Sequence, residues 1–201
     1  MKKGLPASFL TSAKALADCP ADGLPEFAFI GRSNVGKSSL INMLTSKKGL
    51  ATVSSTPGRT RLLNFFNINA NRPWRLVDLP GYGYAKVSAK QRHEFHDLVS
   101  DYLTSREELT CVVQLVDSRL TPQKIDLEFS QWLMDSEIPF ILVFTKTDKS
   151  KSGKVSANIT AFTDAMSEWC EGLPRIFTCS SKTGSGRTPL LEFIDQCLEV
   201  S

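Results

Sequence analysis

The sequence has no long apolar run. None of its apolar stretches approaches the roughly 18 residues that a membrane-spanning helix needs. With 41% hydrophobic and 22% charged residues, the 201-residue chain has the composition of a soluble globular protein, not of a disordered or membrane-embedded one. Its length suits a single domain with a substantial core.

Paired cysteines are also missing. The chain has five cysteines, an odd number, and no two of them form a CxxC motif. They lie far apart in the sequence, at Cys19, Cys111, Cys170, Cys179 and Cys197. This pattern argues against a disulfide framework or a zinc site and favours reduced thiols, so we expect a cytoplasmic protein.

Acidic residues are absent from one long stretch. Residues 45–75 contain no Asp or Glu but six bases, namely Lys47, Lys48, Arg59, Arg61, Arg72 and Arg75. A second basic cluster is formed by Lys146, Lys149, Lys151 and Lys154. The uneven charge makes a polyanionic partner a candidate, and an ordinary solvated charged face is the default interpretation.

Apolar runs alternate with segments of helical period, which predicts an α/β fold with a mostly parallel sheet. The six predicted strands cover residues 26–31, 61–69, 73–79, 110–117, 138–145 and 174–180. The predicted helices cover residues 37–46, 88–104, 122–136, 155–171 and 188–199. Only a few residues separate the second and third strands, so we expect an antiparallel hairpin there and one antiparallel edge strand.

The chain shows no domain boundary after residue 24. We expect residues 24–201 to form a single domain, with residues 1–23 as an extension packed on it. In that extension we expect a short outer helix around Phe9, Leu10, Ala13 and Leu16.

The segment GRSNVGKS, from Gly31 to Ser38, lies between the first predicted strand and the first predicted helix. It matches the GxxxxGK[ST] pattern, whose backbone N–H groups form a cradle for phosphate at a helix N-terminus. Gly31 and Gly36 permit the tight turn. Lys37 brings a positive charge to the outer phosphates, and the Ser38 hydroxyl can ligate Mg²⁺. The motif predicts a nucleoside triphosphate site in a three-layer P-loop NTPase fold.

A second motif, DLPG, ends the hairpin's second strand at Asp78–Gly81. At that position Asp78 can hold Mg²⁺ through water, and the Gly81 N–H can meet the γ-phosphate. A helix or turn cap is the alternative role of Asp78.

Two further motifs choose the base. TKTD, at Thr145–Asp148, ends an apolar strand, and its carboxylate can accept two hydrogen bonds from guanine that adenine cannot donate. The aliphatic stem of Lys146 can lie along the base. CSSK, at Cys179–Lys182, follows the last strand, where a backbone N–H can meet guanine O6. These motifs predict a Ras-like G domain that binds GTP, and they oppose a P-loop kinase or ATPase.

A switch segment that senses the γ-phosphate is expected in STPGRTRL, residues 55–62. A threonine hydroxyl there would complete the Mg²⁺ shell. From spacing alone, either Thr56 or Thr60 can serve.

With these motifs in view, the chain resembles the EngB-type ribosome-assembly GTPases of the Era-like branch. The resemblance rests on PEFAFIGRSNVGKSSLIN, TPGRT, VDLPGYGYA, the Asp117–Arg119 segment with Asp126, TKTD and SSKTG. It implies that Thr60 ligates Mg²⁺, that residues 58–62 form a switch contact and that residues 179–181 make the last guanine contact. It also implies a role in assembly of the large ribosomal subunit and in cell division or septation.

The predicted site follows from these motifs and the resemblance. The expected catalytic residues are Lys37, Thr60 and Gly81, and the expected metal ligands are Ser38 and Thr60. The expected GTP-binding residues are Gly31, Arg32, Ser33, Asn34, Val35, Gly36, Lys37, Ser38, Ser39, Gly58, Arg59, Thr60, Arg61, Leu62, Asp78, Leu79, Pro80, Gly81, Thr145, Lys146, Thr147, Asp148, Cys179, Ser180 and Ser181.

One expected part is missing. The glutamine that orients water in Ras-type enzymes would follow Gly81, but Tyr82 stands there. We therefore expect slow intrinsic hydrolysis, raised by K⁺ held at Asn34 or by a ribosomal partner, rRNA or protein, that meets a basic face. The alternative role of the Asn34 side chain is to stabilise the loop by hydrogen bonds. Arg59 and Arg61 can stabilise charge in cis or contact a phosphate backbone. The alternative function is a nucleotide-gated binding module with negligible catalysis. We expect a monomer.

Overall fold

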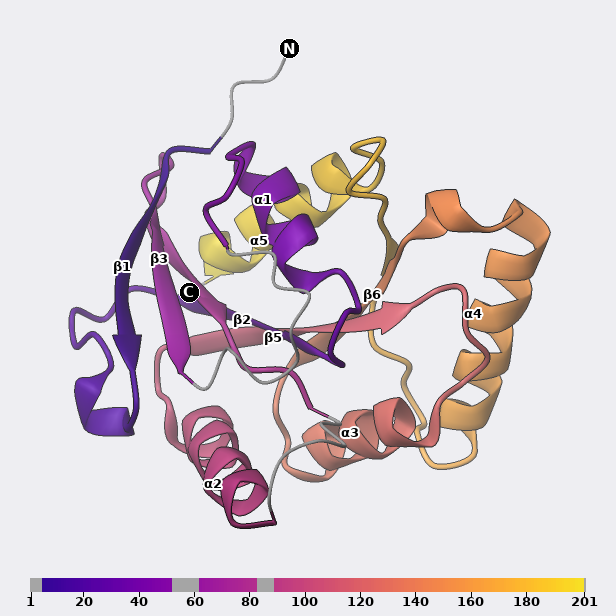
Figure 1. The fold of residues 1–201 in the computed structure, drawn as a ribbon, viewed down its shortest axis with the longest axis horizontal. Coiled ribbons are helices and arrows are strands. Elements are labelled where there is room, and N and C mark those ends of the chain that lie inside the picture. The colour runs from indigo at the N-terminus through magenta and orange to yellow at the C-terminus, as the bar shows by residue number, and fades with distance from the viewer. Residues whose placement is uncertain (1–4, 52–61, 83–88, 201) are drawn as a thin grey trace.

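The computed structural model describes residues 5–51, 62–82 and 89–200. In those ranges the strands form one sheet in the order β1-β3-β4-β2-β5-β6-β7. Their bounds are β1 Ala7–Ala13, β2 Glu26–Gly31, β3 Leu63–Ile68, β4 Trp74–Asp78, β5 Leu109–Asp117, β6 Phe140–Thr145 and β7 Ile176–Thr178. The sheet crosses the centre of the molecule in Figure 1.

Helices cover both faces of this sheet, as Figure 1 shows. One face carries α1 (Lys37–Thr45) and α5 (Arg187–Val200), and the other carries α2 (Ala89–Ser105) and α3 (Lys124–Asp135). The remaining helix, α4 (Ser152–Ser167), packs Phe162 and Met166 beside β6. Short 3₁₀ turns lie at Leu16–Asp18 and Thr147–Lys149. No helix in the described ranges is long and apolar enough to cross a membrane.

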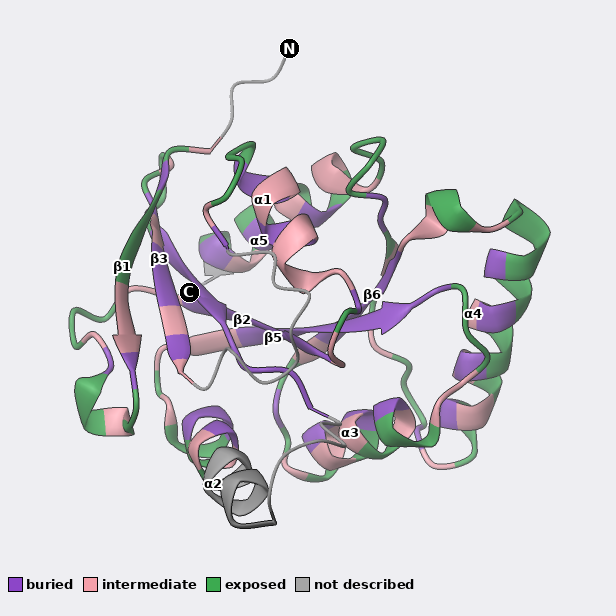
Figure 2. Ribbon diagram, viewed as in Figure 1, coloured by how far each residue is buried: buried purple, intermediate pink, exposed green. Residues whose placement is uncertain are grey.

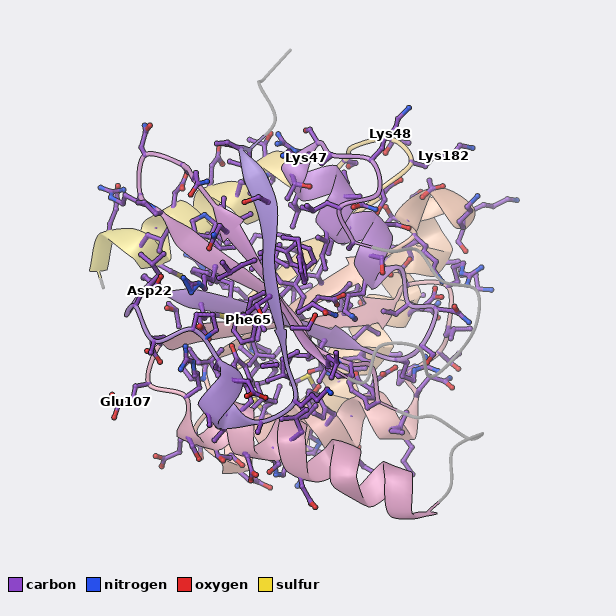
Figure 3. All side chains as sticks on the ribbon, turned by 60° about the vertical axis from the view of Figure 1, so that its left-hand side comes forward. Asp22, Lys47, Lys48, Phe65, Glu107 and Lys182 are labelled. Atoms are coloured by element: carbon purple, nitrogen blue, oxygen red, sulfur yellow. The ribbon has the colours of Figure 1, made fainter. Side chains whose placement is uncertain are left out.

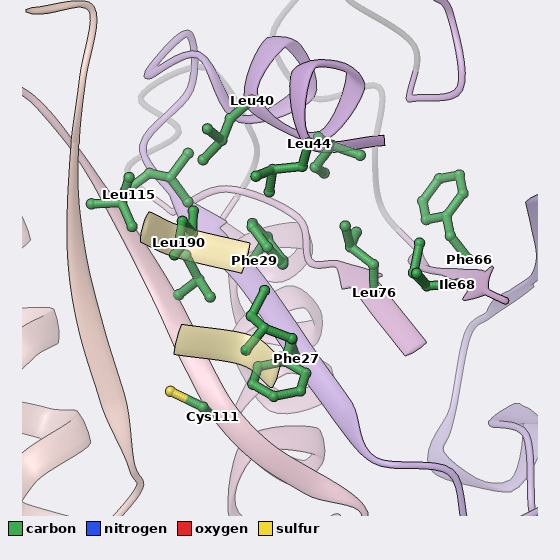
Figure 4. Close-up of a cluster of buried hydrophobic side chains, with 14 of the residues drawn as sticks. Phe27, Phe29, Leu40, Leu44, Phe66, Ile68, Leu76, Cys111, Leu115 and Leu190 are labelled. Carbon is green, nitrogen blue, oxygen red and sulfur yellow. The ribbon is translucent and has the colours of Figure 1, made fainter. Parts of the chain in front are cut away.

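The alternation of side chains along β2 explains why both faces are covered. Phe27 and Phe29 belong to the core under α1 and α5, whereas Ala28 and Ile30 belong to the core under α2 and α3. A strand buried on both sides has no polar face, so its sequence reads as one continuous apolar run. Figure 2 shows β2 and β5 almost entirely buried. Figure 4 shows Phe29 beside Leu40 and Leu44 of α1, and Phe27 further along β2 towards Cys111.

The structure confirms the α/β fold, the mostly parallel sheet and the predicted hairpin. β3 pairs with β4 in antiparallel register, with Phe65 opposite Val77. β2 pairs in parallel with both β4 and β5, and the sheet continues in parallel to β6 and β7. β3 is thus the one strand in the described sheet that runs against the others.

Two details of the expected fold are wrong. The sheet has seven strands in the described ranges, not six, and the expected outer helix around Phe9, Leu10, Ala13 and Leu16 is not formed. Residues 7–13 form β1 instead, which pairs antiparallel with β3 and takes the edge position outside it.

Long-range pairing explains the difference at the N-terminus. β1 satisfies the free hydrogen-bonding edge of β3, and Phe9 meets Phe66 edge-on with ring centroids 5.7 Å apart. The register shifts between Phe9 and Thr11, which marks a bulge or irregularity at Leu10. Because the irregularity breaks the strict alternation of a strand, the apolar residues of this segment fall at a spacing that suggests a helix.

Candidate nucleotide-binding site

The topology brings the sequence motifs to one edge of the sheet. The P-loop residues follow β2, DLPG follows β4, TKTD ends β6 and CSSK follows β7. These four strands run parallel, so their carboxyl ends lie on the same side. Crevices at this edge are where open α/β sheets bind ligands.

The P-loop turns tightly into α1. Gly36, the residue before the helix, has a φ of 107°, in the left-handed region that favours glycine. Val35 N donates to Arg32 O at 3.1 Å, and Leu40 N donates to Gly36 O at 2.9 Å as the helix begins. Backbone N–H groups at the first turn of α1 thus point out of the helix end, where an anion is stabilised.

Lys37 and Asp78 meet inside the site. The Lys37 ammonium contacts the Asp78 carboxylate, and both side chains are largely buried. Burial lowers the pKa of Lys37 to about 7. Ser38 follows Lys37 as the second residue of α1. The Ser38 hydroxyl and the Asp78 carboxylate are hard oxygen donors, so the residues present suit Mg²⁺.

The guanine-side motifs are tied to one another. The Ser180 hydroxyl donates to Asp148 Oδ1 at 2.6 Å, and Thr183 N donates to Ser180 Oγ at 3.2 Å. The hydrogen bond from Ser180 lowers the pKa of Asp148, so the carboxylate is charged at neutral pH. Ser180 is buried and therefore fixes the orientation of one carboxylate oxygen.

The TKTD motif also contacts the P-loop. The buried Thr145 hydroxyl donates to Val35 O at 2.6 Å. The Lys146 ammonium donates to Asn34 O at 2.5 Å and to Asp117 Oδ2 at 2.8 Å. The base-side loop and the phosphate-side loop are therefore held at a fixed separation, as a ligand with a base at one end and phosphates at the other requires.

Asp117 supports this arrangement from the end of β5. Burial alone would raise the pKa of Asp117, but hydrogen bonds from Arg119 and Lys146 outweigh it and lower the pKa to about 2. Arg119 binds both carboxylate oxygens, at 2.9 and 2.7 Å. A charged Asp117 thus holds the Lys146 side chain next to the P-loop. From the sequence, Asp117 and Arg119 supported only the family resemblance, and no role was predicted for either side chain.

Tyr82 and Arg32 turn away from the expected phosphate position. Tyr82 is 5% exposed, and its hydroxyl donates to Asp126 Oδ1 at 2.9 Å. Arg32 Nε binds the same carboxylate at 3.1 and 2.9 Å. Only the backbone of Arg32 therefore remains to serve the GTP-binding role expected for it. In the sequence, Asp126 supported only the family resemblance, and its contact with Tyr82 could not be predicted because 44 positions separate the two residues.

Part of the predicted site lies outside the described residues. This part comprises Thr56, Gly58, Arg59, Thr60 and Arg61, and so includes both candidate threonines of the switch segment. Leu62 is described, and it immediately precedes β3. On the other side of the switch, Ala51 is held by Asn42 of α1. Asn42 donates to Ala51 O at 3.0 Å and accepts from Ala51 N at 2.9 Å.

The basic stretch is only partly exposed. Lys47 and Lys48 lie on the surface after α1, but Arg75 is buried and ion-paired with Asp22. Arg72 is exposed and pairs with Glu199. In Figure 3, Lys47, Lys48 and Lys182 lie in the upper part of the molecule, and Asp22 and Glu107 lie lower, on the opposite side. The second cluster adds exposed residues beside TKTD, namely Lys149, Lys151 and Lys154.

Comparison with known families and proteins agrees with this geometry. A family model described as "50S ribosome-binding GTPase" matches residues 26–146. The chain is 51% identical over 189 residues to "Probable GTP-binding protein EngB" of Bacteroides fragilis strain YCH46, covering 94% of this chain and 93% of that protein. Relatives of the same name occur in Flavobacterium johnsoniae, at 50% identity over 94% of this chain and 90% of theirs.

Solved structures show the same fold. A crystal structure of "a probable GTP-binding protein engB" matches with a TM-score of 0.71 at 24% identity, covering 88% of this chain and all of that one. Era in complex with MgGDPNP and a fragment of 16S ribosomal RNA matches with a TM-score of 0.69 at 25% identity. That match covers 85% of this chain and 55% of Era.

Proposed function

Because the chain belongs to the EngB family of GTP-binding proteins, we propose that it is a GTP-driven switch that acts in assembly of the large ribosomal subunit. The observation that carries the proposal is the rigid frame around the nucleotide site. A charged Asp148 is oriented by Ser180, and TKTD is bonded to the P-loop through Thr145 and Lys146. A role in cell division or septation belongs to the same proposal.

GTP hydrolysis needs positioned water and neutralised charge more than covalent chemistry. Lys37 and the amides at the start of α1 supply positive potential to the phosphates, and the Gly81 N–H meets the γ-phosphate. Ser38, Thr60 and, through water, Asp78 would hold Mg²⁺. When bound, this ion neutralises charge on the β- and γ-phosphates. Thr60 and the other residues of 58–62 make up the γ-phosphate contact in this proposal.

Slow intrinsic turnover is part of the proposal. The Tyr82 hydroxyl is bonded to Asp126 and Gln114 inside the protein, which supports a catalytic site without a water-orienting side chain at this position. An external group then raises the rate. K⁺ at the side-chain oxygen of Asn34 is one candidate, and hydrolysis measured in K⁺ and in Na⁺ tests it. Equal rates in the two salts would dismiss the potassium site.

The partner in this proposal is rRNA or a ribosomal protein, and the contact is a basic face. Exposed lysines support it: Lys149, Lys151 and Lys154 follow TKTD and Lys182 ends CSSK, while Lys47 and Lys48 lie beyond the far end of α1. A contact of this kind weakens steeply with salt, since each neutralised phosphate releases a counterion. We further propose a cytoplasmic monomer in which residues 24–201 form the G domain and residues 1–23 pack on it. The pairing of β1 with β3 supports that packing.

Co-sedimentation with large ribosomal subunits tests the function. We expect the chain to pellet with subunits in the presence of a GTP analogue and to remain in solution with GDP or without nucleotide. Equal pelleting in all three states, or none, would contradict a GTP-driven switch.

A nucleotide-gated binding module with negligible catalysis is the second candidate, and the internal bonding of Tyr82 favours it. GTP turnover with and without subunits separates the two. Stimulation by subunits supports the first, and no measurable turnover in either condition supports the second.

A further inference from the structure

A buried polar network lies behind the phosphate cradle. Asp126, in the first turn of α3, is 1% exposed, yet it accepts hydrogen bonds from Arg32 Nε and from the Tyr82 hydroxyl. Gln114 of β5 donates to Tyr82 Oη at 3.1 Å and to Asp126 O at 2.9 Å. Gln114 Oε1 in turn accepts from Ser130 Oγ at 2.8 Å.

The direction of both bonds at the Tyr82 hydroxyl is fixed. The Tyr82 oxygen accepts from Gln114, so its single proton goes to Asp126. Asp126 can only accept, and it receives one bond from a phenol and two contacts from a guanidinium. Each donor at Tyr82 and Asp126 is therefore paired with an acceptor. A buried network whose hydrogen bonds are all satisfied is rigid.

The Tyr82 ring is fixed as firmly as its hydroxyl. It stacks on Phe129 of α3 with centroids 4.5 Å apart, and Phe129 packs against Trp132. The side chain of the residue after DLPG thus packs against α3. Such a side chain cannot also face a water molecule at the γ-phosphate.

Tyr82 in turn holds Gly81 against the P-loop. Tyr82 N donates to Gly31 O at 3.2 Å, and a bridge pairs Tyr82 with Arg32. A Cβ atom on Gly81 would lie 2.6 Å from Gly31 O, so only glycine allows this approach. The Gly81 backbone thus lies against the P-loop, and the residues that flank this contact, Arg32 and Tyr82, are both bound to the Asp126 carboxylate.

The charge on Asp126 makes the arrangement costly to disturb. Burial raises the pKa of Asp126, while the Arg32 guanidinium and the Tyr82 hydroxyl oppose the rise. A buried charge that loses its partner is strongly destabilising. The position of Arg32 is therefore coupled to that of Tyr82, although the two side chains come from different loops.

We propose that Asp126 is a positioning residue for GTP hydrolysis. It clamps the P-loop, through Arg32, to the residue after DLPG, through Tyr82, and so holds the Gly81 N–H where the γ-phosphate is bound. The proposal rests on the GTPase function proposed above. Because GDP lacks the γ-phosphate, loss of the Tyr82 hydroxyl alone acts on the catalytic step and leaves GDP binding unchanged, whereas loss of the Asp126 charge also releases Arg32 of the P-loop.

Steady-state hydrolysis by the purified full chain tests the clamp in two variants. Asp126→Asn removes the charge that binds Arg32, and Tyr82→Phe removes only the hydroxyl and keeps the ring on Phe129. For each, we expect kcat for GTP to fall about tenfold, a loss of the size that small misplacements of a catalytic group cause. For Tyr82→Phe, we expect the dissociation constant of GDP, measured by calorimetry, to change less than about twofold, since this variant keeps the ion pair of Arg32 and alters only γ-phosphate contacts.

Two matched controls separate positioning from stability. Glu128→Gln removes an exposed charge from the same helix, outside the network. Tyr102→Phe removes the buried hydroxyl that binds Glu26 and is expected to lower the melting temperature without changing kcat. If Asp126→Asn is poorly folded, Tyr82→Phe alone decides, because it keeps the packing and the ion pair.

The outcomes distinguish this inference from the function beneath it. Reduced kcat with intact GDP binding in Tyr82→Phe supports the clamp. An unchanged kcat in Tyr82→Phe, or a loss equal to that of Tyr102→Phe, overturns it while GTPase function stands. No GTP turnover by the unsubstituted chain, even with ribosomal subunits, refutes the GTPase function and with it the clamp.

Discussion

Replacing Thr145 with valine is expected to loosen the P-loop. The substitution keeps the shape of the side chain and deletes the hydroxyl that donates to Val35 O at 2.6 Å. Thr145 is 3% exposed and Val35 is equally buried, so water cannot readily replace the lost donor. The Val35 carbonyl would be left without the bond that fixes the turn before Gly36.

The magnitude follows from the cost of an orphaned buried acceptor. Leaving a buried carbonyl unsatisfied costs about 1–3 kcal/mol, so we expect Thr145→Val to lower the free energy of unfolding by about 2 kcal/mol. For a domain of this size, that corresponds to a fall of roughly 4–8 °C in melting temperature. Nucleotide affinity should also fall, because part of the binding energy is then spent on ordering the P-loop.

Urea unfolding without nucleotide and calorimetric titration with GDP measure the two effects. Thr160→Val is the matched control, because Thr160 is exposed on α4 and its replacement should change stability by less than about 0.5 kcal/mol. A Thr145→Val chain that is as stable as the control and binds GDP equally well would refute the reasoning.

Three further predictions concern the base, acid pH and the start of the switch. Asp148→Asn should shift preference from guanine toward xanthine nucleotides, and unchanged GTP affinity in competition titrations would contradict the base assignment. Since the pKa of Asp117 falls to about 2 on folding, its contribution to stability should be complete above about pH 4 and lost between about pH 4 and pH 2. The acid unfolding curve of the unsubstituted chain should show this loss of stability, and that of Asp117→Asn should not. Identical curves for the two proteins would count against the pairing of Asp117 with Arg119. Asn42→Ala removes both hydrogen bonds to Ala51 and should lower the free energy of unfolding, measured in urea, by about 1–3 kcal/mol. An unchanged free energy of unfolding would mean that water replaces these bonds.

The sequence was sufficient for the parts of the fold that depend on local pattern. The apolar run of β2 followed by a glycine-rich turn predicted the strand, the phosphate cradle and α1. The short gap between β3 and β4 predicted their antiparallel pairing, because a few residues cannot form a crossover helix. The motifs fall at the carboxyl ends of parallel strands, which is why the sequence could bring Gly36, Asp78 and Asp148 to one edge.

Contacts between distant segments could not be predicted in this way. β1 pairs Ala13 with Leu63, and no local period reports which edge a strand will join. The Ser180 bond to Asp148 and the Tyr82 bond to Asp126 each join residues more than 30 positions apart. Such side chains acquire their roles only when the sheet has placed their loops together. In the sequence Tyr82 therefore marked only the absence of a glutamine.

Calorimetric titration of the pure chain with GTP and with ATP tests the central claim most directly. An oriented carboxylate at Asp148 that must pair with guanine donors should disfavour ATP by about 10⁴-fold, so we expect a clear GTP isotherm and no detectable ATP binding. ATP binding as tight as GTP binding, or no binding of either nucleotide, would contradict the account.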